Sequence, residues 1–75
     1  MAEWDCIAIF ESTHAALAAE RAARAAGLAT RMGPVPRSIS ADCNMGMLFA
    51  GADRPGVAAV LAAAAIETRI FELAR

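Results

Sequence analysis

The sequence contains no lysine, a single histidine and only two cysteines. All 7 basic residues are therefore arginines, which are scattered among 8 acidic residues and leave a net charge of −1. A chain without a basic stripe lacks the electrostatic footprint of a nucleic-acid-binding protein, so we expect no nucleic-acid partner. One histidine and two separated cysteines are also too few for zinc, which takes four protein ligands, or three at an open site. We therefore expect no metal.

Long apolar runs are missing as well. No stretch reaches the roughly 18 residues that a membrane-spanning helix needs, and the acidic residues near the first methionine do not fit a signal peptide. We therefore expect a cytoplasmic protein without a membrane partner. The 75 residues leave room for one domain, 1–75. A chain this short buries only roughly 60% of its surface, so we expect no enclosed cofactor and any chemistry on the rim of the fold.

What the sequence does contain is a set of short apolar runs and two alanine-rich stretches. The apolar runs are rich in residues that favour strands, and they predict β-strands at 4–10, 28–32, 45–50 and 66–73. The alanine-rich stretches favour helices, and they predict them at 14–26 and from 54 to 64 or 65.

Residues at the ends of the predicted helices support this assignment of strands and helices. Ser12 or Thr13 is suited to cap the first helix, and Gly27 is suited to end it. Asp53 is expected to cap the second helix, with Pro55 in the first turn, where its missing N–H does no harm. The first helix is therefore bounded at both ends, and the second at its start, by residues that the sequence itself identifies.

The resulting order, βαββαβ, is that of two interleaved split βαβ units. We therefore predict an α+β, ferredoxin-like sandwich whose antiparallel sheet has the strand order 4-1-3-2 and carries both helices on one face. In this arrangement the end of the first strand, the start of the first helix and the loop between the second and third strands share one edge. Six residues are expected to converge there: Ser12, Thr13, His14, Arg37, Ser40 and Cys43.

The two cysteines are too few for a disulfide framework and are expected to be free thiols. Cys6 lies within the first predicted strand, about 10 Å from Cys43 at about 3.3 Å per residue. That distance is too long for a bridge. We expect Cys6 to be buried as a small hydrophobic residue.

Cys43 lies at the end of a polar, proline-containing loop. The positive partial charge at the start of the first helix, together with Arg37 and His14, would lower the pKa of its thiol, whereas Asp42 would raise it. The residues alone leave two readings open, an activated nucleophile or a loop cysteine without a role. In the same way, Arg37 is either an anion-binding residue or a solvated one, and His14 is either a base or a surface residue of the first turn.

Three segments carry a family resemblance: Ser12-Thr13-His14-x-Ala16-Leu17-x-Ala19-Glu20, Ala26-Gly27 and Pro34-x-Pro36-Arg37-x-Ile39-Ser40-x-x-Cys43. Over nearly its whole length the chain resembles a small bacterial family of selenium/sulfur (Se/S) carrier-like proteins, formerly a domain of unknown function. The resemblance implies that Cys43 is the carrier cysteine, with supporting residues at Arg37, Ser40, His14, Thr13 and Ser12. The chain departs from the family at Asn44, where a glycine usually follows the cysteine.

Two functions follow as hypotheses. In the first, Cys43 takes sulfur or selenium from a donor protein such as a cysteine desulfurase and passes it to an acceptor protein, as a carrier rather than a turnover enzyme. In the alternative, the chain is a non-catalytic ferredoxin-like module for protein interaction or small-ligand regulation. Four apolar strand residues cannot all face the helices: Ile7, Ile9, Met45 and Met47. The face of the sheet away from the helices would then be partly apolar, which would favour a homo-oligomer.

Overall fold

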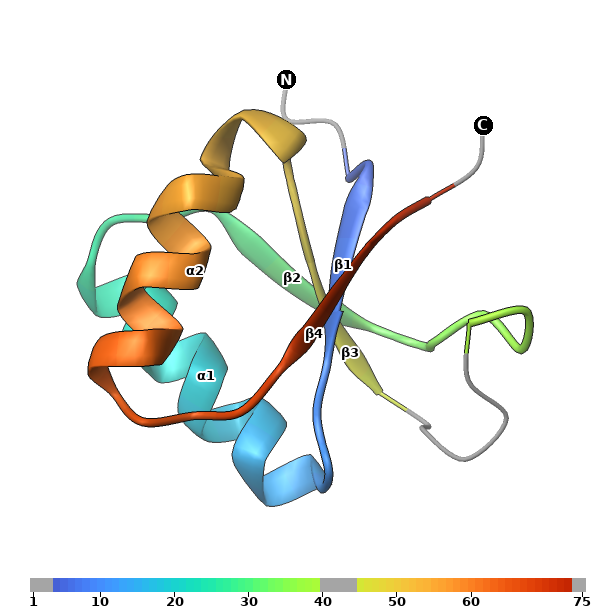
Figure 1. Cartoon of the computed structure of the whole chain (residues 1–75), viewed down its shortest axis with the longest axis horizontal. Coiled ribbons are helices and arrows are strands. Elements are labelled where there is room, and N and C mark those ends of the chain that lie inside the picture. The colour runs from blue at the N-terminus through green and yellow to red at the C-terminus, as the bar shows by residue number, and fades with distance from the viewer. Residues whose placement is uncertain (1–3, 40–44, 74–75) are drawn as a thin grey trace.

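The computed structural model describes residues 4–39 and 45–73. It is an α+β fold in which two helices accompany a four-stranded antiparallel sheet (Figure 1). The strands are β1 (Cys6–Ile9), β2 (Thr30–Gly33), β3 (Gly46–Phe49) and β4 (Arg69–Glu72). The helices are α1 (Thr13–Ala25), α2 (Arg54–Ala63) and a short 3₁₀ helix, η1 (Gly51–Asp53). The predicted elements are therefore present, and each observed strand is shorter than its apolar run.

The strands lie in the order β2-β3-β1-β4. Counted from the other edge of the sheet, the same order reads 4-1-3-2. The register pairs Ile9 with Gly46 and Arg69, and Gly46 with Gly33. The ends of β1 and β2 and the starts of β3 and β4 therefore meet at one end of the sheet, which we call the Ile9 end.

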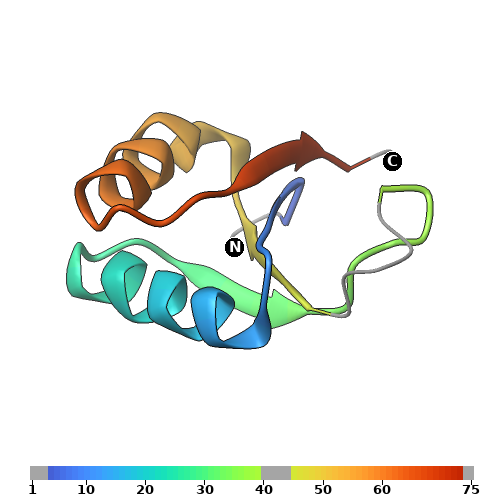
Figure 2. The ribbon, with the colours of Figure 1, turned by 60° about the horizontal axis from the view of Figure 1, so that its bottom comes forward.

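Both helices cover the same face of the sheet, on the left in Figures 1 and 2. The main core lies between this face and the helices, and the helices supply small or branched side chains to it. Alanines of α1 are fully buried here, which lets that helix lie close to the strands. The buried members of this core are Cys6, Ala8, Phe10, Ala16, Ala19, Ala23, Met47, Phe49, Val57 and Leu61.

Both helices end in the same backbone motif. Gly27 follows α1 and Ala65 follows α2, and both have left-handed backbone angles, with φ of 80° and 57°. In each case the next residue donates its N–H to a carbonyl five positions earlier in the helix, at 3.0 Å and 2.9 Å respectively. These bonds define a Schellman motif, which turns the chain from each helix into the following strand. Gly27 is the expected stop residue, whereas Ala65 takes the same conformation with a side chain.

The two helices begin differently. Ser12 caps α1, since its Oγ accepts a hydrogen bond from the N–H of Ala15 at 3.1 Å. The prediction that Asp53 caps α2 is wrong, because its side chain makes no capping hydrogen bond. Its backbone is already helical, with φ −92° and ψ 0°, whereas a capping residue normally has an extended backbone. Pro55 does lie in the first turn of α2, as expected.

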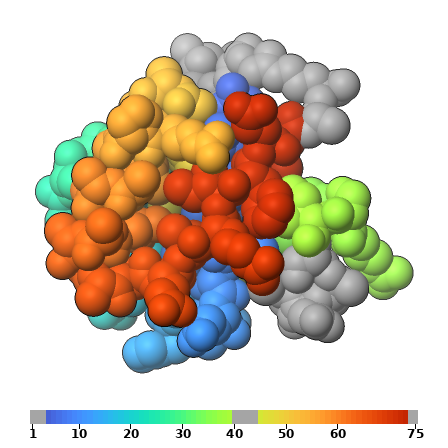
Figure 3. All heavy atoms as spheres, viewed as in Figure 1, coloured from blue at the N-terminus to red at the C-terminus, as the bar shows by residue number. Residues whose placement is uncertain are grey.

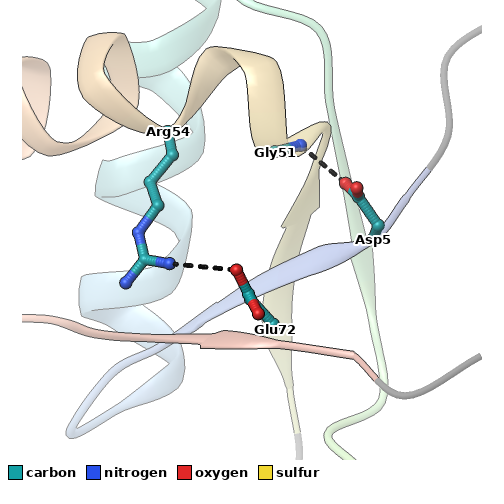
Figure 4. Close-up of polar contacts among 4 residues, drawn as sticks. All are labelled: Asp5, Gly51, Arg54 and Glu72. Atoms are coloured by element: carbon teal, nitrogen blue, oxygen red, sulfur yellow. Dashed lines mark hydrogen bonds and ion pairs between the residues drawn. The ribbon is translucent and has the colours of Figure 1, made fainter.

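The chain before α2 is tied to the start of β1 instead. The Asp5 carboxylate accepts a hydrogen bond from the N–H of Gly51 at 2.6 Å, where η1 begins (Figure 4). A nearby ion pair joins Arg54 to Glu72 at 3.8 Å, but both side chains are largely exposed. Such a pair contributes at most about 1 kcal/mol. Of these two polar contacts, the Asp5 hydrogen bond is therefore the one that ties the segment before α2 to the start of β1.

Candidate functional site

The start of α1 brings three of the predicted site residues to the Ile9 end of the sheet. Ser12, Thr13 and His14 follow β1 after only two intervening residues, and all three are exposed. The Ser12 hydroxyl is engaged as the helix cap. Thr13 and His14 are the first two residues of α1, next to the unpaired N–H groups that give a helix start its positive partial charge.

The segment that contains Arg37 starts at the same end of the sheet but runs in another direction. It lies in segment 34–39, which follows β2 and contains a turn closed by a 3.0 Å hydrogen bond from the N–H of Ile39 to the carbonyl of Pro36. Figures 1 and 2 show this segment on the side of the sheet away from the helices. The side chain of Arg37 is exposed there.

The predicted convergence is therefore only partly visible in the structure. Both segments start at the Ile9 end, but they continue on opposite faces of the sheet. Within 4–39 and 45–73, no hydrogen bond or ion pair joins Arg37 to the start of α1. Two members of the predicted set, Ser40 and Cys43, lie outside the described residues, as do their neighbours Asp42 and Asn44.

Segment 34–39 forms a second apolar cluster that the sequence reading did not predict. Val35 is only 8% exposed and packs against Ile7 and Ile9, which point away from the helices. Partly buried residues complete this cluster: Ile39, Leu48, Phe71 and Leu73. The signal was present in the sequence, because Val35 and Ile39 are the only large apolar residues of an otherwise polar stretch. The composition of the stretch predicts a polar loop, because two isolated apolar residues give no periodic signal.

This cluster bears on the expected apolar surface on the face of the sheet away from the helices. Ile7 and Ile9 do face away from the helices, but they are 0% and 3% exposed because residues of the same chain cover them. Met47 lies in the helix-side core, and only Met45, 39% exposed, is open to solvent. The expectation that these four residues do not all face the helices is therefore confirmed, but the apolar residues on the other face are largely covered by the chain itself. Homo-oligomerisation stays a prediction without this support.

Two glycines make room for the second cluster. Gly33 and Gly46 are paired across β2 and β3 at the Ile9 end. A Cβ on Gly46 would lie 2.7 Å from Cδ1 of Ile7 and 3.0 Å from the carbonyl oxygen of Ala8, closer than side-chain carbons approach such atoms. A Cβ on Gly33 would lie 3.0 Å from Cδ1 of Leu48. The side chains of Ile7 and Leu48 therefore occupy the space that a side chain at either glycine would need.

Cys6 is buried on the helix side of the sheet, 2% exposed, as the sequence predicts. Burial raises the pKa of its thiol, and the adjacent Asp5 carboxylate raises that pKa further, while Arg54 opposes the shift. A buried thiol with a raised pKa is neither accessible nor ionised at neutral pH. Cys6 is therefore a structural residue.

Two further findings concern the part of the chain that the structure covers. Its histidine, cysteine and carboxylate side chains form no group of three that could hold a metal ion. Neither of its helices combines the length and the apolar character that crossing a membrane requires.

Comparison with known proteins identifies a family. The model of the family described as "Putative Se/S carrier protein-like" matches residues 5–72, which is most of the chain. No curated protein and no solved structure matches the sequence.

Proposed function

Because the chain belongs to the Se/S carrier-like family, we propose that it carries sulfur or selenium and that Cys43 is the residue that holds the load. The observation that carries this proposal is the family match over 5–72, which spans the segment with Cys43. The burial of Cys6 supports it independently. Since the sequence has only two cysteines and one of them is buried with a raised pKa, Cys43 is the remaining candidate for thiol chemistry.

The proposed step is a transfer of sulfane sulfur. The Cys43 thiolate attacks the outer sulfur of a persulfide on a donor cysteine, so that a new S–S bond forms on Cys43 while the donor's S–S bond breaks. The electron pair of the broken bond leaves with the donor cysteine as its thiolate. The oxidation states balance between the two proteins, so no further oxidant or reductant is needed. The same exchange with a selenium atom would give a selenopersulfide on Cys43.

The Ile9 end of the sheet suits this chemistry. Cys43 precedes Met45 by two residues in the sequence, and two residues span at most about 7 Å. Met45 directly precedes β3 at the Ile9 end and is exposed. The proposal therefore puts the thiol at the Ile9 end of the sheet, the end from which α1 also starts, and gives Thr13 and His14 the role of favouring a thiolate.

The remaining supporting roles are proposed with it. Arg37 and Ser40 belong to the same connection as Cys43 and would stabilise the anion that the transfer needs. We further propose that the observed βαββαβ order and the shared face of the helices represent a ferredoxin-like sandwich. In that arrangement one rim of the fold presents the thiol while the rest serves as scaffold.

Intact-mass measurement tests the proposal. The protein is incubated with a persulfide-loaded cysteine desulfurase, and the wild type is compared with Cys43→Ser and Cys6→Ser. We expect the wild type and Cys6→Ser to gain the mass of one sulfur atom and Cys43→Ser to gain none. An equal gain in mass on Cys43→Ser, or no gain in mass on the wild type, would contradict the proposal.

A further inference from the structure

The face of the sheet away from the helices, which we call the open face, carries an unusual distribution of charge. Two of its eight strand positions are arginines, Arg31 on β2 and Arg69 on β4, and none is acidic. These two strands are the edges of the sheet, so the arginines flank the open face on both sides. The other strand positions on this face are apolar or glycine: Ile7, Ile9, Gly33, Gly46, Leu48 and Phe71.

Within the part of the chain that the structure describes, these two arginines are not paired with acidic side chains. Glu72 of β4 faces the other side of the sheet, where it pairs with Arg54 at 3.8 Å. The Asp5 carboxylate accepts the hydrogen bond from Gly51 (Figure 4). Among residues 4–39 and 45–73, no acidic side chain forms an ion pair with Arg31 or Arg69, and both arginines are exposed. The described strand positions of this face therefore carry positive charge only, although the net charge of the chain is −1.

Two partly exposed apolar side chains lie between the arginines, on either side of Ile7, which the chain itself covers. Leu48 and Phe71 are half-buried on the open face, and segment 34–39 packs against the same cluster. Figure 3 shows this segment next to the C-terminal strand on the outer side of the molecule. Exposed Arg37 adds a third positive charge on this side. Apolar area with arginines around it is the composition that protein interfaces favour.

We propose that the open face, between Arg31 and Arg69, is the docking surface for the sulfur-donor protein, whose complementary surface has acidic residues around an apolar patch. This inference rests on the proposed carrier function. Charge complementarity identifies the partner class, because a surface with three arginines and no strand acid attracts an acidic surface and repels a basic one. A second copy of this chain fits poorly, since pairing through this face would bring the arginines of both copies together.

The binding of a purified cysteine desulfurase tests the docking surface. Binding is measured by biolayer interferometry at low and at high salt for the wild type and for the double variant Arg31→Glu/Arg69→Glu. We expect the double variant to bind about tenfold more weakly or worse, and the wild type to lose affinity as salt rises. The matched control is Arg21→Glu/Arg24→Glu, which changes the charge of two exposed arginines on α1. This control should bind like the wild type.

A milder variant, Arg31→Gln/Arg69→Gln, keeps the test decisive if the charge reversal unfolds the protein. It should weaken binding in the same direction by a smaller factor. Absence of wild-type binding, or equal losses for the open-face and α1 variants, would overturn the docking surface. The docking surface would also be overturned if the protein bound single-stranded RNA instead of the desulfurase. That RNA binding would have to weaken with salt and in the Arg31→Glu/Arg69→Glu variant.

Transfer from a small persulfide separates this inference from the carrier function. Glutathione persulfide needs no protein surface, so the Arg31→Glu/Arg69→Glu variant should accept sulfur from it at the wild-type rate. If the wild type accepts sulfur from glutathione persulfide but does not bind the desulfurase, the docking surface fails and the carrier function stands. If the wild type accepts no sulfur from any donor, the carrier function fails whatever the binding result.

Discussion

At the scale of single residues, the two cysteines differ in kind. Cys6 is part of the helix-side core, and the structure raises the pKa of its thiol through burial and through Asp5. The sequence predicted this burial from the apolar run around Cys6. The ionisation of Cys43 could not be predicted in the same way, because the sequence supplies opposing charges, Arg37 and Asp42, without their distances.

The raised pKa of Cys6 predicts that the protein loses stability in alkaline solution. Below about pH 8.5, the usual pKa of a free thiol, the thiol is protonated in both the folded and the unfolded state. Above that pH the unfolded state releases the proton while the folded state retains it, so the free energy of unfolding falls as pH rises towards the higher pKa of the folded state. We expect a loss of at most about 2 kcal/mol at pH 10.

Urea unfolding of Cys43→Ser at pH 7.5 to 10, read by circular dichroism, measures this loss. The sequence favours the measurement, because it has no lysine and no tyrosine to titrate in the same range. The control is Cys6→Ala/Cys43→Ser, whose stability should change little over this range. A decline of the same size in the control would contradict the assignment to Cys6.

Ala65 is a second residue with a specific consequence. It takes the left-handed conformation after α2, with φ of 57°, where Gly27 takes it after α1. A residue with a Cβ costs roughly 1–2 kcal/mol in this conformation. We therefore expect Ala65→Gly to raise the free energy of unfolding by about 1 kcal/mol, and Gly27→Ala to lower it by a similar amount. Chemical denaturation of the two variants checks both signs, and destabilisation by Ala65→Gly would refute the argument.

At the scale of elements, the helices and strands were largely predictable and the path of the loop was not. The apolar runs and alanine-rich stretches located every strand and both longer helices, and the signals at Ser12, Gly27 and Pro55 marked their ends. The prediction that Asp53 caps α2 failed because η1 continues into α2 and gives Asp53 a helical backbone. The packing of segment 34–39 onto the sheet could not be predicted, because two apolar residues among polar ones give no periodic signal.

Val35 tests whether segment 34–39 is part of the folded core. Its side chain is 8% exposed against Ile7 and Ile9, so Val35→Ala should lower the free energy of unfolding by about 1–2 kcal/mol. The same substitution on the helix side, Val57→Ala, provides the comparison, since Val57 is completely buried. A value near zero for Val35→Ala, with a clear loss for Val57→Ala, would show that the segment does not contribute to the core.

At the scale of the whole molecule, the sheet is covered on both faces by different means. The helices cover one face, and segment 34–39 covers part of the other, at the Ile9 end (Figure 1). The connection that contains Cys43 therefore begins with residues packed onto the sheet and ends at β3. This arrangement supports the proposal that the fold is a scaffold for a reactive connection at one rim. It also supports the proposal that a partner protein binds the face flanked by arginines.

The carrier assignment is tested most directly by locating the transferred sulfur within the chain. The wild type is loaded by a cysteine desulfurase supplied with radiolabelled cysteine, its persulfides are capped with iodoacetamide, and the protein is digested with trypsin. The absence of lysine and the proline after Arg54 put Cys43 in peptide 38–69 and Cys6 in peptide 1–21. The account predicts label on 38–69 and none on 1–21. Label on 1–21, or on neither peptide, would contradict it.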